Sequence, residues 1–78
     1  MARRVAGVEI AAAIRQPSEE SVFRLSTRAS VDFDVSAVCA TFGGGGHPRA
    51  AGATLTGFAD IAAAEQAVLA AIRAQASQ

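Results

Sequence analysis

The residues of this chain best suited to chemistry are four consecutive glycines followed by a histidine, at positions 43–47. Glycine loses more backbone entropy on folding than any other residue, so a folded domain keeps such a run where something must approach the backbone closely. Successive amides can converge on an anion when residues take left-handed conformations, which glycine adopts without strain. His47 follows at the rim of the loop and can donate a hydrogen bond to a phosphate oxygen. The loop therefore predicts a site for an anionic ligand, with phosphate as the best fit.

Familiar phosphate-binding loops do not match these glycines. A nucleoside triphosphatase loop requires Gly-Lys-Ser or Gly-Lys-Thr, and the chain contains no lysine. A dinucleotide fingerprint follows a strand and opens a helix, whereas this loop follows a predicted helix and enters a predicted strand. A flexible linker is the plainer interpretation, but a linker more often contains serine and continues into polar residues.

A second candidate site lies on the predicted strand over 22–28, whose side chains alternate between apolar and polar. The side chains predicted to share the apolar side are Phe23, Leu25 and Thr27. Those predicted to share the other side are Arg24, Ser26 and Arg28. An ordinary solvated face explains this second side, and so does a polar face that grips an oxyanion, since arginine forms forked bonds to phosphate.

The remaining residue types with chemical potential favour structural roles. Cys39 falls on the apolar stripe of a predicted helix, which favours a buried packing thiol over a reactive one. Arg49 is expected to be an exposed charge. The candidate metal ligands are Asp32, Asp34, Cys39, His47 and Asp60. They show no ligand spacing, so we expect no metal site made by this chain alone.

Strands and helices must position these residues. In chain order the pattern predicts a strand over 5–15, a strand over 22–28, a helix over 35–42, a strand over 50–56 and a second helix. Asp32 or Asp34 caps the first helix, which Gly43 ends, and Asp60 caps the second. The buried stripe of the second helix is predicted to be Ile61, Ala64, Val68, Leu69 and Ile72. The tail over 74–78 is expected to fray.

This order of strand, strand, helix, strand, helix predicts a single domain over 1–78 with an α+β (α/β-like) fold. The first two strands are joined by a short turn at Pro17 and should pair antiparallel. The strand–helix–strand portion suggests a right-handed crossover between parallel strands. We therefore expect a small mixed β-sheet with the helices packed on one face.

The composition narrows the functional classes. The formal net charge is zero, with seven arginines and seven acidic residues, which argues against binding long nucleic acid through a broad basic surface. A small nucleotide held by two or three local cations remains compatible with it. No stretch approaches the roughly 20 apolar residues needed to span a bilayer. A single cysteine suits a reducing compartment, so we expect a soluble, cytoplasmic protein.

Residues 42–52, Phe-Gly-Gly-Gly-Gly-His-Pro-Arg-Ala-Ala-Gly, resemble the signature of the DHH-associated domain, first subfamily. Ser26-Thr27-Arg28 is similar to the Ser-x-Arg strand motif of that family, and Phe33-Asp34-Val35-Ser36 to its helix-opening pattern. The resemblance covers about 22–72. The domain is the C-terminal, substrate-binding part of DHH-family phosphoesterases. These include RecJ-like nucleases, oligoribonuclease and pAp phosphatases, cyclic-dinucleotide phosphodiesterases and exopolyphosphatase-related proteins.

The resemblance implies a partner domain in cis and a set of roles. An N-terminal DHH domain would hold two divalent metals, usually manganese, and this domain would close over it. Gly44, Gly45 and Gly46 would line the nucleotide, and His47 would approach the scissile phosphate in a supporting catalytic role. Arg28 would neutralise a terminal phosphate of short RNA, pAp or a cyclic-dinucleotide product, and Ser26 would add a hydrogen bond.

The chain departs from that family's complete enzymes because it contains no Asp-His-His motif. We therefore expect this fragment to be inactive alone, and its first strands as well as the upstream domain to be missing. Two alternatives remain. One is an RNA-binding module like the C-terminal domain of alanyl-tRNA synthetase. The other is an interaction domain whose sheet edge forms a homodimer surface.

Overall fold

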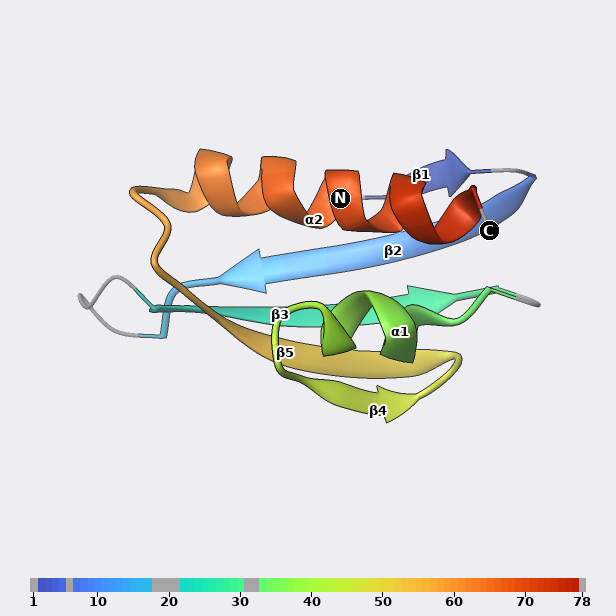
Figure 1. Cartoon of the computed structure of the whole chain (residues 1–78), viewed down its shortest axis with the longest axis horizontal. Helices are drawn as coiled ribbons and strands as arrows, with labels where there is room; N and C mark the ends of the chain where they lie inside the picture. The colour runs from blue at the N-terminus through green and yellow to red at the C-terminus, as the bar shows by residue number, and fades with distance from the viewer. Residues whose placement is uncertain (1, 6, 18–21, 31–32, 78) are drawn as a thin grey trace.

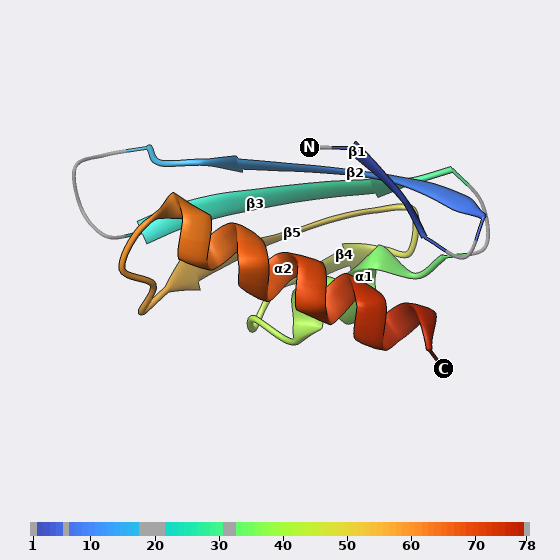
Figure 2. The same ribbon diagram turned by 90° about the horizontal axis from the view of Figure 1, so that it is seen from above.

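The computed structural model describes residues 2–5, 7–17, 22–30 and 33–77 of the chain. It shows a five-stranded sheet with strand order β1-β2-β3-β5-β4 and two helices. The elements are β1 (Ala2–Val5), β2 (Val8–Arg15), β3 (Val22–Ala29), α1 (Val35–Ala40), β4 (Gly45–His47), β5 (Ala50–Thr56) and α2 (Ile61–Ala76). Both helices lie on one face of the sheet, as predicted (Figures 1 and 2). None of the described helices is long and apolar enough to cross a bilayer.

The two long strands β2 and β3 confirm the predicted alternation. On β3, the side chains of Phe23, Leu25 and Thr27 are buried, while the intervening residues are exposed. On β2, Ile10 and Ala12 are buried and their neighbours are not. Because one side of each strand faces the helices, these buried side chains belong to the core between sheet and helices.

Helix α1 begins at the predicted cap and ends earlier than predicted. The Asp34 carboxylate accepts hydrogen bonds from the amides of Ser36 (2.9 Å) and Ala37 (3.2 Å) and from the Ser36 hydroxyl. Asp32, the alternative cap, lies outside the described residues. The prediction extended the helix to Phe42, but its last residue is Ala40. The next residues form the turn that ends the helix, with Gly43 in the predicted left-handed conformation (φ 79°).

Helix α2 confirms the second cap, because the Asp60 carboxylate accepts from the Ala63 amide at 2.8 Å. Four of the predicted stripe residues are buried: Ala64, Val68, Leu69 and Ile72. Ile61 was predicted to be buried and is 45% exposed. Side chains on a helix tilt toward its N-terminus, so the first residue of α2 points past the end of the packed face. The helix continues to Ala76, beyond the start of the segment expected to fray.

The fold class is α+β, as predicted, but the expectation of parallel strand pairing is wrong. All four strand pairings in the described sheet are antiparallel, including β3 with β5. The reason is the short strand β4, which lies within the glycine run and turns back into β5. Because this hairpin reverses the chain after α1, β5 runs opposite to β3. A second difference is strand β1, which was not predicted and meets the strand predicted over 5–15 only at Val5. Gly7 (φ 79°) separates β1 from β2, so the predicted strand begins at Val8.

Candidate anion site on the open face of the sheet

The face of the sheet turned away from the helices, here called the open face, has no element covering it in the described structure (Figure 2). Strand register places four of the smallest side chains in one row across this face. Ser26 on β3 is opposite Ala13 on β2 and opposite Gly52 on β5, and Gly52 is opposite Gly45 on β4. Because paired residues project to the same side, this small-residue row crosses four strands with little to obstruct a ligand.

A row carrying arginine and histidine borders the small-residue row on one side. Arg28 is opposite Ala11 and Ala50, and Ala50 is opposite His47. Arg28 and His47 are both exposed. Alternate residues of a strand are about 6.6 Å apart, so the two rows are separated by about that distance. The Arg28 guanidinium and the His47 imidazole therefore border the small-residue row on the same side.

Four of the predicted site residues meet at one hollow of about 280 Å³, here called the Arg28 hollow. Its lining residues include Ser26, Arg28, Gly45 and Gly46, with backbone from β5 as the floor. Gly44 lies outside it and lines a neighbouring hollow instead. His47 does not line it either, but its register partner Ala50 does. The structure thus brings together residues from β3 and β4 that lie about 20 positions apart in the sequence.

The glycine run does not form the amide cradle that the sequence suggested. The amides of Gly43 and Gly44 donate to the carbonyls of Ala40 (3.0 Å) and Cys39 (2.9 Å), the pairing of a Schellman helix end. Gly45 and Gly46 belong to β4 and pair with β5. Two of the four amides are therefore committed to ending α1, and the glycines bring backbone close to backbone rather than encircling an anion.

Packing against β5 explains why two of these positions need glycine. A Cβ at Gly44 would lie 2.6 Å from the Cβ of Ala53, and one at Gly46 would lie 2.8 Å from the Cα of Ala51. Real Cβ atoms essentially never approach so closely. A side chain at either position would separate β4 from β5.

Gly45 differs from Gly44 and Gly46 because packing against β5 does not require a glycine at this position. A Cβ at Gly45 would meet nothing within 4 Å. Its φ is not among the positive values found at Gly43 and Gly46. It ends the small-residue row and lines the Arg28 hollow. A glycine that neither backbone conformation nor packing requires, at the edge of a hollow, favours a ligand that comes close to the backbone.

The hydrogen bonding of His47 defines which ring nitrogen faces outward. The Arg49 amide donates to His47 Nδ1 at 3.1 Å. An accepting Nδ1 carries no proton, so the neutral ring carries its proton on Nε2 and can donate from there. Arg49 was predicted to be an exposed charge, but it is half-buried in the turn, where its carbonyl accepts from the Ala29 amide at 3.1 Å.

A comparison with known protein families agrees with this geometry. The family model for the DHHA1 domain matches residues 1–78. The chain belongs to the DHHA1 domain family. The DHHA1 domain is the DHH-associated domain of DHH-family phosphoesterases, so the resemblance seen in the sequence is confirmed. No curated protein matches the chain.

Beneath the open face of this DHHA1 domain, a buried polar contact ties the site strands to α1. The Thr27 hydroxyl donates to the Ala51 carbonyl at 2.7 Å and lies 3.4 Å from Cys39 Sγ. Cys39 is fully buried, which confirms the packing role predicted for its thiol. Thr27 belongs to the lining of the Arg28 hollow but is buried, and its hydroxyl is engaged in holding β3 and β5 in place.

The open-face residues of this DHHA1 domain that sequence reasoning missed are the small ones, Ala11, Ala13 and Gly52. They carry no reactive group, and their place beside Ser26 and Arg28 follows from strand register alone. The one signal in the sequence was the strand period of residues 8–15, which places Ala11 and Ala13 on the side opposite Ile10 and Ile14. Among the described residues, no group of three or more His, Cys, Asp or Glu side chains is placed to hold a metal ion.

Proposed function

We propose that this DHHA1 domain binds the phosphate-bearing end of a short oligoribonucleotide, pAp or a cyclic-dinucleotide product for a DHH-type phosphoesterase. The observation that carries the proposal is the Arg28 hollow, in which a cation, a hydroxyl and an unobstructed glycine backbone from two distant segments meet. Family membership supports the reaction class, phosphoester hydrolysis.

Each residue has a chemical task in this proposal. The Arg28 guanidinium forms forked hydrogen bonds to the terminal phosphate. The Ser26 hydroxyl donates a further hydrogen bond to the same group. The backbone at Gly45 lets the sugar or phosphate lie against β4. His47 donates from Nε2 to a second phosphate oxygen, which orients the ester for attack.

The metal chemistry of such an enzyme belongs to another part of the protein. The donor set among the described residues does not fit a divalent ion, because Asp34 and Asp60 cap helices and Cys39 is buried. We propose that two divalent ions, manganese in the family, are held by an N-terminal DHH domain in cis. We expect the chain alone to be inactive.

Titration of the 78-residue chain with pAp, followed by amide NMR shifts and calorimetry, tests the proposal. We expect the largest shifts at Ser26, Arg28 and Gly45. Arg28→Ala should weaken binding about tenfold, the scale of one lost charge-assisted hydrogen bond. Arg73→Ala is the matched control, because Arg73 is an exposed arginine on α2, across the sheet from the hollow. Equal affinities for the Arg28 variant and the control would overturn the assignment, and shifts seen with tRNA but not with pAp would favour the RNA-binding module instead.

A further inference from the structure

The other border of the small-residue row carries two arginines that face each other. Arg15 on β2 is directly opposite Arg24 on β3, and Arg24 is opposite Thr54 on β5. Like charges directly opposite each other on a sheet destabilise it. Within the described residues, neither arginine has an acidic partner, and the ion pair found there joins Arg4 to Glu9 elsewhere. Among the described residues, packing and ion pairing do not account for two charges placed side by side.

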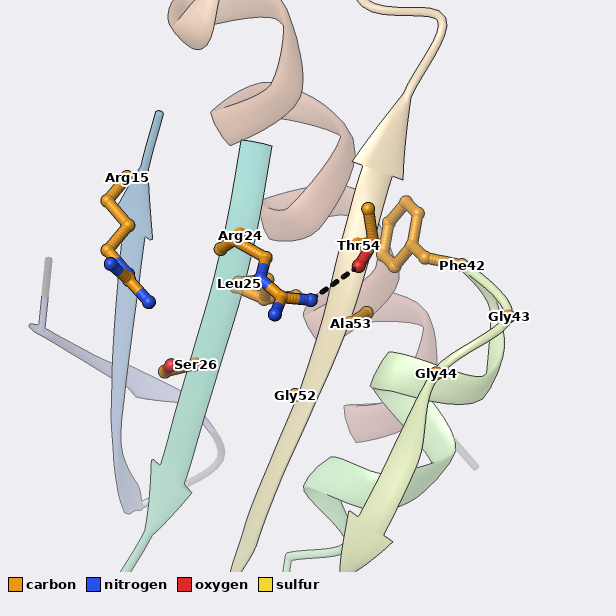
Figure 3. A pocket seen from close by; sticks show the side chains of 10 residues that line it. All are labelled: Arg15, Arg24, Leu25, Ser26, Phe42, Gly43, Gly44, Gly52, Ala53 and Thr54. Atoms are coloured by element: carbon orange, nitrogen blue, oxygen red, sulfur yellow. Dashed lines mark hydrogen bonds between the residues drawn. The ribbon is translucent and has the colours of Figure 1, made fainter. Parts of the chain in front are cut away.

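Both guanidinium groups lie at one hollow, here called the Arg15–Arg24 hollow. Its volume is about 430 Å³, larger than that of the Arg28 hollow, and its lining includes Arg15, Arg24, Thr54 and Phe42. Figure 3 shows the two arginine side chains directed over the open face, with Arg24 reaching across to β5. Arg24 Nη1 donates to Thr54 Oγ1 at 2.9 Å, which holds this guanidinium in place with its other donors still available.

The two hollows are continuous. Ser26 and Gly52, the centre of the small-residue row, line both. Arg24 and Arg28 are four residues apart on β3, and a strand rises about 3.3 Å per residue, so their Cα atoms are about 13 Å apart. The small-residue row is therefore the floor of a trough with a basic group on each side.

The Arg15–Arg24 hollow also has an apolar wall. The Phe42 ring borders it beside Thr54 (Figure 3). This ring packs edge-on against Phe58, with centroids 6.4 Å apart and an interplanar angle of 61°, which fixes its orientation. Two cations, a hydroxyl and an aromatic wall form the combination that a nucleotide unit requires, with a phosphate on the arginines and a base or ribose on the ring.

We propose that Arg15 and Arg24, with Thr54, form a second phosphate-binding subsite that holds an internal phosphodiester of the oligonucleotide whose terminal phosphate lies at Arg28. The proposal rests on the proposed function for the position of the terminal phosphate. An oligonucleotide crossing the trough then bridges both basic borders. The two phosphates of pAp are one nucleotide apart and lie at the Arg28 border, whereas a phosphodiester further along a longer chain reaches the Arg15–Arg24 border.

A length series separates the two subsites. The affinities of wild type, Arg28→Gln and the double variant Arg15→Gln/Arg24→Gln are measured for pAp and for the ribonucleotides pApA and pApApA. The double variant should bind pApApA about tenfold or more weakly and pAp nearly as tightly as wild type does. Arg28→Gln should weaken all three ligands. Equal weakening of pAp and pApApA by the double variant would overturn the second subsite, because it would indicate a general charge effect.

The salt dependence of ligand binding gives a second, independent test of the second subsite. For single strands the slope of log affinity against log salt concentration is about −0.7 per phosphate contact. The double variant loses one phosphate contact to pApApA, so its slope for this ligand should be smaller in magnitude than that of wild type by about 0.7. The slope for pAp should be the same in the double variant as in wild type. An unchanged slope for pApApA would overturn the proposal. If Arg28→Gln has no effect while the double variant still discriminates by length, the proposed function fails at Arg28 and the second subsite stands.

Stability of the free protein separates a ligand role from a structural one. Because Arg15 and Arg24 repel each other, Arg15→Gln should leave the thermal midpoint unchanged or raise it. A clear fall would assign Arg15 to the fold. A further variant, Thr54→Val, removes the hydrogen bond that holds Arg24 and should weaken pApApA binding more than pAp binding.

Discussion

The two sides of strand β3 differ in what determines their side chains, although both belong to one strand. On the helix side, Leu25 is 2% exposed and belongs to the core. On the open side, Ser26 is exposed and lines both hollows. Packing against the helices explains the side chains on the helix side, where side-chain volume determines which residues fit. The open side holds like charges and small residues that packing does not call for, which is the composition expected under the proposed function.

Truncating a core residue should produce the largest effect in this comparison. Leu25→Ala removes a buried side chain and leaves a cavity, so it should lower the free energy of unfolding by about 2–5 kcal/mol. Urea denaturation followed by circular dichroism measures this loss. Ser26→Ala, the next residue along, should change stability by less than about 0.5 kcal/mol. Similar losses for the two variants would remove the distinction between the faces.

The glycine run offers a sharper test, because neighbouring residues of the same type should respond differently. Gly44→Ala should lower the free energy of unfolding by about 1–3 kcal/mol, since its Cβ would overlap Ala53. Gly45→Ala should leave stability nearly unchanged, because the added methyl meets nothing within 4 Å. The same Gly45 variant should weaken pAp binding, measured by calorimetry. Normal binding by Gly45→Ala would show that this glycine serves neither fold nor ligand.

The sequence sufficed for features that depend on local periodicity and capping. Alternation along β3 separated its buried residues from its exposed ones. Asp60 was predicted as the cap of α2, and Asp34 was one of two candidates for the cap of α1; both carboxylates accept from amides two or three residues away. The exposed positions of Ser26 and Arg28 followed from the same alternation. Each of these depends on neighbours in the chain, which a sequence displays directly.

Features that depend on pairing between distant strands were missed. Strand β4 was not predicted, because glycines have no side chains that could form an alternating pattern. Without β4, β5 was expected to run parallel to β3, whereas it runs antiparallel. The small-residue row and the opposition of Arg15 and Arg24 both follow from register between strands, which one chain segment does not reveal. The residues of β3 that border the trough could therefore be predicted to share one side of that strand, while the trough itself could not be predicted.

The smallest expected effect concerns the N-terminal cap of α1, the helix that leads into the glycine run. The Ser36 hydroxyl, followed by the amides of Ala37 and Ser36, lowers the pKa of Asp34 below its ordinary value of 3.8, against an opposing effect of burial. A carboxyl group whose pKa is lower in the folded state stabilises the fold fully above its unfolded-state pKa and loses that contribution as pH falls through the folded-state value. Thermal midpoints should therefore fall below about pH 4 in wild type and fall less in Asp34→Asn, because asparagine also caps helices but does not titrate there. Parallel pH profiles for the two proteins would show that this carboxylate does not contribute to acid sensitivity.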